Sequence, residues 1–286
     1  MKCYYHVYTK GLEDDVIFRC DEDYVAGMNY VPVVLNGKDI FVLAFVLMSN
    51  HFHFILYATQ QDAIEFINAY KILVSRYIFE KYGVSELLRK VKAGVSVIRD
   101  ESEELKEKIA YVLNNPTAAG INCFATGYEW GSGRCYFSGI RRQDMNVPLS
   151  SYSVRAQRTL LHSHVKLPQD YMVTSRGYIN PMSYVDWSQV ERLFCRVTSL
   201  QYHLNMSGKN KNPSRYSLVF SDELLINVIA QMLDKQYGGL PVSELSAESL
   251  RFLVKDINRR FNSSAKQLAR VLALPLQTVV SVLKSE

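Results

Sequence analysis

Apolar and polar positions follow two different periods along the first part of the chain. Residues 3–9 alternate with a period of two, which predicts a β-strand. Residues 39–58 are almost continuously apolar, rich in β-branched and aromatic residues, and interrupted at Ser49-Asn50. This stretch predicts two buried strands or one bent strand. A further short strand is expected near residues 95–100.

Apolar residues spaced three and four apart predict helices between these strands. Residues 60–82 should form a long amphipathic helix that ends before Gly83. Residues 101–116 should form another helix, stopped by Pro116. Residues 21–36 favour a helix less strongly. The order of these elements predicts an α+β fold with helices on one side of a sheet.

The pattern changes beyond residue 130. Residues 131–183 are richer in Gly, Ser, Pro and Arg and have weaker apolar periodicity, so a loop-rich connector is expected. Residues 184–286 are mainly helical in pattern. Within them, residues 263–285 contain two short apolar helical stretches around Pro275, which resembles a helix-turn-helix. The expected organisation is therefore a domain at 1–130, the connector, and a helical C-terminal region.

Composition narrows the class of protein. The 286 residues are 48% hydrophobic and 21% charged, which argues against disorder. The chain has no uncharged apolar run of membrane-spanning length and no apolar signal region near its first residues, so no membrane association is expected. Five irregularly spaced cysteines predict reduced thiols and a cytoplasmic protein. The net charge of +5 permits a nucleic-acid partner without requiring one.

The most informative segment is SNHFHFIL, at residues 49–56. In a strand, His51 and His53 point to one face while Phe52 and Phe54 point to the other, toward a core. Two neighbouring imidazoles can bind a divalent cation. From the spacing alone, however, two satisfied histidines on a polar sheet face are the simpler explanation.

A second candidate segment is EKIAYVLNNPTAAGI, at residues 107–121. Tyr111 and Asn115 are four residues apart and should be neighbours on one helix face. Lys108, three residues before the tyrosine, is either a solvated lysine or a cation that favours the phenolate or binds a DNA phosphate. An amphipathic tyrosine and a helix-ending asparagine are the ordinary alternatives. The expected buried stripe comprises Leu105, Ile109, Val112 and Leu113.

The opening strand YYHVYTKG, the SNHFHFIL strand and the AYVLNNPTAAG helix together resemble the single-tyrosine HUH transposases, and among them the REP-associated tyrosine transposases. The resemblance covers about residues 3–130. It implies a ferredoxin-like antiparallel sheet with helices, which is the HUH nuclease fold. It also implies an enzyme that nicks single-stranded DNA beside hairpins and transfers strands through a 5′-phosphotyrosine. Some members of this family are homodimers.

The resemblance implies roles for individual residues. Tyr111 would be the nucleophile, and a Mg²⁺ or Mn²⁺ ion would be held by His51, His53 and Asn115. Such an ion neutralises phosphate charge, and Mn²⁺ tolerates imidazole better than Mg²⁺ does. A phenol with a pKa of about 10 needs activation before it attacks. Asn115 is a weaker ligand than a carboxylate, and Ser49 stands where many relatives have proline.

The segment that resembles a helix-turn-helix provides a candidate DNA-binding surface. Its second helix would expose Gln277, Thr278, Ser281 and Lys284. Nearby cations would contact phosphates: Arg259, Arg260, Lys266 and Arg270. A helical bundle used only for packing or dimerisation is the alternative.

Three functions therefore remain open. The leading one is a metal-dependent endonuclease and strand transferase for single-stranded or hairpin DNA. The second is a DNA-binding protein of transposase ancestry whose nuclease activity is weak or lost. The third is a hydrolase that activates water at His51 and His53, with Tyr111 incidental. A covalent protein–DNA product would separate the first from the third.

Overall fold

The computed structural model describes residues 1–9, 15–84, 88, 91, 93–99, 101–121, 124–138, 146–209, 222–261 and 263–285. Its centre is a four-stranded antiparallel sheet in the order β2-β3-β1-β4. The strands are β1 (Cys3–Thr9), β2 (Phe41–Met48), β3 (His51–Ala58) and β4 (Ala93–Ile98). Helix α1 (Asp21–Leu35) connects β1 to β2, and α2 (Gln60–Tyr82) connects β3 to β4. This element order and strand order are those of a ferredoxin-like sheet.

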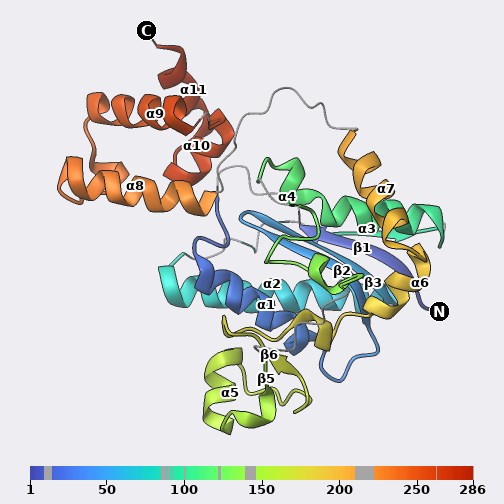
Figure 1. The fold of residues 1–286 in the computed structure, drawn as a ribbon. Helices are drawn as coiled ribbons and strands as arrows, with labels where there is room; N and C mark the ends of the chain where they lie inside the picture. Colours follow the sequence, from blue (N-terminus) through green and yellow to red (C-terminus); the bar gives the residue numbers. More distant parts are fainter. Residues whose placement is uncertain are drawn as a thin grey trace.

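The apolar stretch at residues 39–58 forms two strands, with Ser49 and Asn50 as the turn between them. Seven of the eight residues of β2 are buried, so the sheet must be covered on both faces. Helices α1 and α2 cover one face, while α3 (Glu103–Leu113) packs against β2 and β3 on the other (Figure 1). The expectation of helices on one side only is therefore wrong.

Helix ends follow local chemistry. Helix α2 begins after Thr59, whose hydroxyl accepts a hydrogen bond from the Asp62 amide at 3.1 Å, and ends at Gly83 with φ of 68°. Helix α3 buries the predicted apolar stripe. It ends at Leu113, earlier than expected, and Pro116 lies in the first turn of α4 (Asn115–Ala118). Proline is tolerated there because its missing N–H would have no helical partner.

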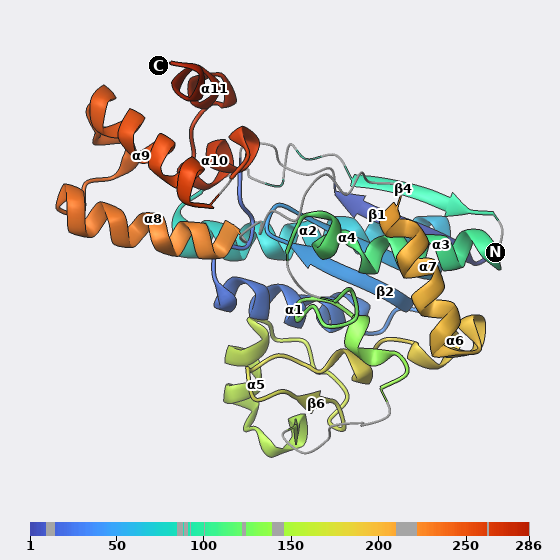
Figure 2. The ribbon, with the colours of Figure 1, turned by 45° about the horizontal axis from the view of Figure 1, so that its top comes forward.

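The first part of the region expected to be mainly helical forms two helices, α6 (Trp187–Phe194) and α7 (Val197–Lys209). The break is at Cys195, which has a positive φ of 61°. The buried residues of α6 belong to the same hydrophobic core as the sheet, and α7 lies along α3 (Figure 2). The Asn114 side chain donates to the Leu204 carbonyl at 2.5 Å. These two helices thus pack with the sheet.

The segment expected as a connector has a small apolar cluster of its own. It is tied to α1 through Asn29, which is fully buried. The Asn29 amide donates to the Leu160 and Gly177 carbonyls at 3.0 and 3.1 Å and accepts from the Ile179 amide at 2.8 Å. The regular elements of this segment are η1 (Gly133–Cys135), β5 (Val147–Pro148), η2 (Leu149–Ser151), α5 (Val154–Leu161), β6 (Met172–Val173) and η3 (Pro181–Ser183).

The C-terminal helices form a unit with a separate hydrophobic core, drawn in orange and red in Figure 1. Its elements are α8 (Asp222–Tyr237), η4 (Val242–Glu244), α9 (Ala247–Phe261), α10 (Ala265–Leu272) and α11 (Leu276–Lys284). Ser264 caps α10, and Ala273 in the left-handed conformation begins the turn to α11. Within the described residues, no helix is both long and apolar enough to cross a membrane.

Candidate metal and tyrosine site

The two histidines of β3 share one face of the sheet. Their ring centroids are 5.0 Å apart. Phe52 and Phe54 point the other way and pack edge-on against Tyr70 of α2. The alternation predicted for this strand is therefore confirmed, and both imidazoles lie on the face that α3 covers.

His53 is paired with His6 of β1, the neighbouring strand. His6 Nε2 lies 3.0 Å from His53 Nδ1, and both side chains are buried. Burial, together with the positive charge of Lys108, lowers the pKa of His6 to about 4. His6 is therefore neutral near pH 7, and its Nε2 can accept a hydrogen bond from His53 Nδ1–H. In that tautomer His53 keeps a lone pair on Nε2, the form required of a metal ligand.

His51 is oriented by its neighbour in the turn. Its Nδ1 lies 2.8 Å from Asn50 Oδ1. Because an amide oxygen only accepts, Nδ1 carries the proton and Nε2 carries the lone pair. That Nε2 faces Asn115 Oδ1 at 3.5 Å, a separation too long for a strong hydrogen bond. Two ligands of one cation, each about 2.1 Å from it, lie at a comparable separation.

The Asn115 amide is fixed from the opposite side. Its nitrogen donates to the Tyr111 carbonyl at 2.9 Å and to the Val112 carbonyl at 3.4 Å. Residue 116 is a proline and cannot make the usual helical hydrogen bond to the Val112 carbonyl, to which the Asn115 side-chain amide donates instead. This pairing directs Oδ1 of Asn115 toward His51.

Tyr111 projects from α3 onto the histidines. Its ring is edge-on to His53, with centroids 5.6 Å apart, and to His6, with centroids 5.8 Å apart. Lys108 lies one helical turn earlier and close enough to depress the pKa of His6. A phenol, an ammonium group and the imidazoles therefore meet at one place, although they come from positions as far apart as 6 and 111.

Two other tyrosines that could be considered as nucleophiles lie elsewhere. Tyr77 and Tyr82 project from α2, on the other face of the sheet, and their hydroxyls donate to Asp23 at 3.3 and 2.9 Å. Burial and the charge of Asp23 raise the pKa of Tyr77 to about 12. Neither phenol is near the histidines, so Tyr111 is the better candidate.

The three side chains that could bind a metal ion here, His51, His53 and Asn115, include no carboxylate. Among the described residues, no group of three or more His, Cys, Asp or Glu side chains could hold a metal ion. A cation at this site would therefore have two imidazole nitrogens and one amide oxygen from the protein. Such a neutral set fits a weakly held Mn²⁺ better than a Mg²⁺ ion, which prefers oxygen ligands.

Comparisons with known proteins reveal only a distant structural similarity. No family model matches the chain, and no curated protein matches it. One solved structure that it resembles is a REP-associated tyrosine transposase bound to a REP hairpin. The two are 10% identical, the match covers 49% of this chain and 82% of that chain, and the TM-score is 0.37. A similarity this low carries no functional argument, so the case for the site rests on its geometry.

The C-terminal candidates fall into two groups. Most lie at the surface: Gln277, Ser281, Lys284, Lys266, Arg259 and Arg260 are exposed, and Thr278 is half-buried. Arg259 and Arg260 also pair with Asp256. Arg270 differs, because its guanidinium binds the buried carboxylate of Asp222 at 2.6 and 2.9 Å. Arg270 thus has a partner inside the protein, which its helical position alone does not indicate.

Two contributors to the site were not predicted. The sequence pattern marks Asn50 only as part of an interruption between strands, whereas in the structure its side chain orients His51. Tyr8 stacks on His6, with ring centroids 4.8 Å apart. Its ring lies over Gly94 of β4, where any Cβ would come within 2.3 Å of it.

Proposed function

We propose that this protein is a metal-dependent endonuclease for single-stranded DNA that uses Tyr111 as its nucleophile, beside DNA hairpins. The observation that carries the proposal is the packing of Tyr111 edge-on against His53, whose neighbour His51 faces Asn115. A phenol, two oriented imidazoles and an amide oxygen match the needs of phosphodiester cleavage through a covalent intermediate. A 5′-phosphotyrosine retains the bond energy, so strand transfer can follow without ATP.

The residues of the site would have different roles in this reaction. His51, His53 and Asn115 would hold the cation, with Asn50 and His6 fixing the two imidazoles. When bound, the cation would neutralise the scissile phosphate and polarise it for attack. The Tyr111 oxygen forms a bond to phosphorus while the bond to the 3′ oxygen breaks. The phenol proton is lost to solvent and the departing 3′ oxygen gains one. Lys108 would supply positive charge beside the phosphate.

The C-terminal unit would bind the stem of the hairpin. Helices α10 and α11 with the intervening turn have the length and order of a helix-turn-helix. The exposed Gln277, Ser281 and Lys284 of α11 would contact the duplex, with Arg259 and Arg260 near the phosphates. The adjoining single strand would then reach the site on the sheet.

A covalent-adduct experiment tests the proposal. The full chain is mixed with labelled single-stranded hairpin oligonucleotides and Mn²⁺, then separated on a denaturing gel. We expect label to migrate with the protein, and to disappear with chelator and in Tyr111→Phe. Tyr77→Phe is the matched control, since its ring lies on the opposite face, and it should form the adduct normally. An adduct that persists in Tyr111→Phe would refute the assignment.

One observation favours a second function. The candidate site lacks a carboxylate, and no cluster of three His, Cys, Asp or Glu is present in the described parts of the chain. A DNA-binding protein with weak or lost nuclease activity has the same features. Hairpin binding without any adduct, in Mg²⁺ and in Mn²⁺, would favour this second function.

A further inference from the structure

A buried carboxylate connects the C-terminal helices to the histidine strand. Asp222 is the first residue of α8 and is 5% exposed. From its own unit it accepts hydrogen bonds from Arg270, at 2.6 and 2.9 Å, and from the Gln267 amide at 3.0 Å. From the sheet it accepts a hydrogen bond from the Ser49 hydroxyl at 2.5 Å. Asp222 therefore bridges α10 and the turn between β2 and β3.

The turn that Asp222 contacts is the one that orients His51. The Ser49 carbonyl accepts from the backbone amides of Ile17 and Phe18 at 2.7 and 3.0 Å. The next residue, Asn50, accepts from His51 Nδ1. Hydrogen bonds thus link Arg270 through Asp222 to Ser49, and the chain itself joins Ser49 to Asn50, the acceptor for His51.

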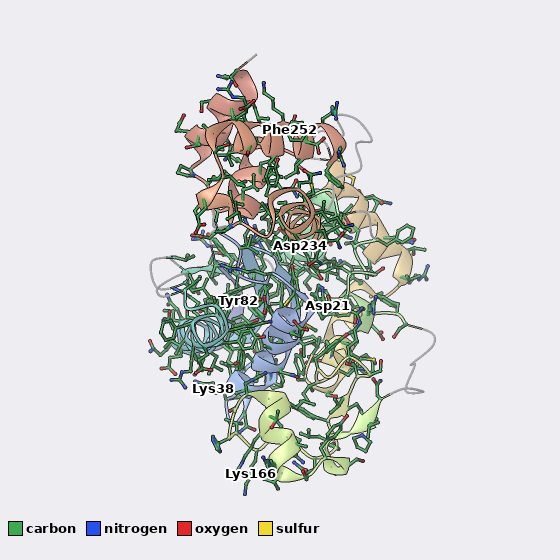
Figure 3. All side chains as sticks on the ribbon, turned by 90° about the vertical axis from the view of Figure 1, so that its left-hand side faces the viewer. Asp21, Lys38, Tyr82, Lys166, Asp234 and Phe252 are labelled. Carbon is green, nitrogen blue, oxygen red and sulfur yellow. The ribbon has the colours of Figure 1, made fainter. Side chains whose placement is uncertain are left out.

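The buried carboxylate of Asp222 requires its hydrogen-bond donors to lie in a defined arrangement. A carboxylate removed from water is stable only when charged and polar donors surround it closely. Arg270 provides a two-pronged pair, which fixes the plane of the carboxylate as well as its position. A shift of α10 would therefore move Asp222, and Ser49 would follow or lose its acceptor. Figure 3 shows the C-terminal helices above α1, with Asp21 at the end of α1 nearer to them and Asp234 above it.

We propose that Asp222 is a positioning residue for His51, through which the arrangement of α10 is transmitted to the candidate metal site. This inference rests on the function proposed above only for its consequence, the control of metal binding. The coupling itself concerns residues of this chain and is measurable without metal or DNA. Asp222 contacts neither cation nor phosphate and acts through Ser49 and Asn50.

The test follows the imidazole of His51 by nitrogen NMR in the full chain, with the signal assigned through His51→Gln. Ser49→Ala removes one hydroxyl and leaves Asp222 paired with Arg270, while Arg270→Ala alters the bridge from the other side. Both should change the His51 nitrogen shifts. Arg259→Ala is the matched control within the same unit, because its partner is Asp256. Asp234→Asn, on an exposed position of α8, is a second control.

The outcomes separate the two proposals. Unchanged His51 signals in Ser49→Ala and Arg270→Ala would overturn the bridge, and Ser49→Ala decides alone if Arg270→Ala does not fold. Mn²⁺ added to the unmodified chain should broaden the signals of His51 and His53, and its failure to do so would overturn the metal site instead. Where Mn²⁺ binds, Ser49→Ala should weaken it by up to about tenfold, the lower end of the loss seen for partners of ligands.

Discussion

His6 Nε2 lies 3.0 Å from His53 Nδ1, so an imidazole of β1 occupies one ring nitrogen of the β3 histidine and leaves Nε2 available for a cation. The two residues are neighbours across an antiparallel pair in which Tyr8 is opposite His53. Burial lowers the pKa of His6 to about 4, so the ring is neutral in the physiological range and its Nε2 can accept from His53 Nδ1–H. The orientation of His53 is therefore set by the sheet before any ligand arrives.

Replacing His6 tests this role. His6→Ala removes the acceptor for His53 Nδ1–H and should weaken Mn²⁺ binding about tenfold or more, as for other partners of metal ligands. His6→Gln retains an acceptor and should recover part of that loss. Calorimetric titration with Mn²⁺ measures both, and His164→Ala, at an exposed histidine of the connector, is the control. Equal affinities for His6→Ala and the unmodified chain would contradict the role.

Asn115→Asp should strengthen metal binding. The change introduces a carboxylate oxygen where an amide oxygen now faces His51, and hard cations favour the charged ligand. It also removes the amide donor to the Tyr111 and Val112 carbonyls, so we expect a loss of about 1–2 kcal/mol in unfolding free energy. Mn²⁺ titration and thermal melting measure the two effects. Asn180→Asp, on the connector, is a control for the added charge.

Much of the sheet domain could be predicted from periodicity. The bounds of α2 and the division of β3 into two faces follow from apolar spacing, because each element buries one side against the same core. The helices that cover the two faces of the sheet could not be predicted as easily. A continuous apolar strand such as β2 indicates burial, but not which distant helix supplies it. Helix α6 is one of these covering helices, and its sequence alone would equally allow it to pack with the C-terminal helices.

The candidate site was predictable where its parts are close in sequence. His51 and His53 are set by strand alternation, and Tyr111 and Asn115 by helical spacing. The contacts of Asp222 with Ser49 and Arg270 join residues 173 and 48 positions apart, and no local pattern indicates them. Arg270 illustrates the limit, since an arginine on a helix next to a turn favours a DNA contact until its buried partner is known.

Glu223, next to Asp222, should make stability depend on pH. Burial and the nearby Asp21 raise the pKa of Glu223 to about 7, with Asp23 adding to the effect and Arg176 opposing it. Between about pH 4.5 and 7 the folded chain keeps this proton while the unfolded chain loses it, so stability falls as the pH rises through that window. Above pH 7 both states are ionised and the loss is complete.

Glu223→Gln isolates this contribution. The neutral amide cannot ionise, so the melting temperature of the variant relative to the unmodified chain should increase from pH 5 to pH 7.5. Thermal melts followed by circular dichroism at several pH values measure the difference. Glu248→Gln, at an exposed position of α9, should show no such trend. A constant difference between Glu223→Gln and the unmodified chain would show that the carboxyl is not protonated in the folded state.

Lys284→Ala should weaken the binding of hairpin duplex evenly across sequences. Lys284 is exposed at the end of α11, where a lysine can neutralise one phosphate and release its counterion. Removing it should lower the slope of log affinity against log salt by about 1. Fluorescence anisotropy over a range of salt concentrations measures the slope. Lys235→Ala, on the exposed side of α8, should leave the slope unchanged, whereas an equal loss in both variants would place the duplex on another surface of the C-terminal unit.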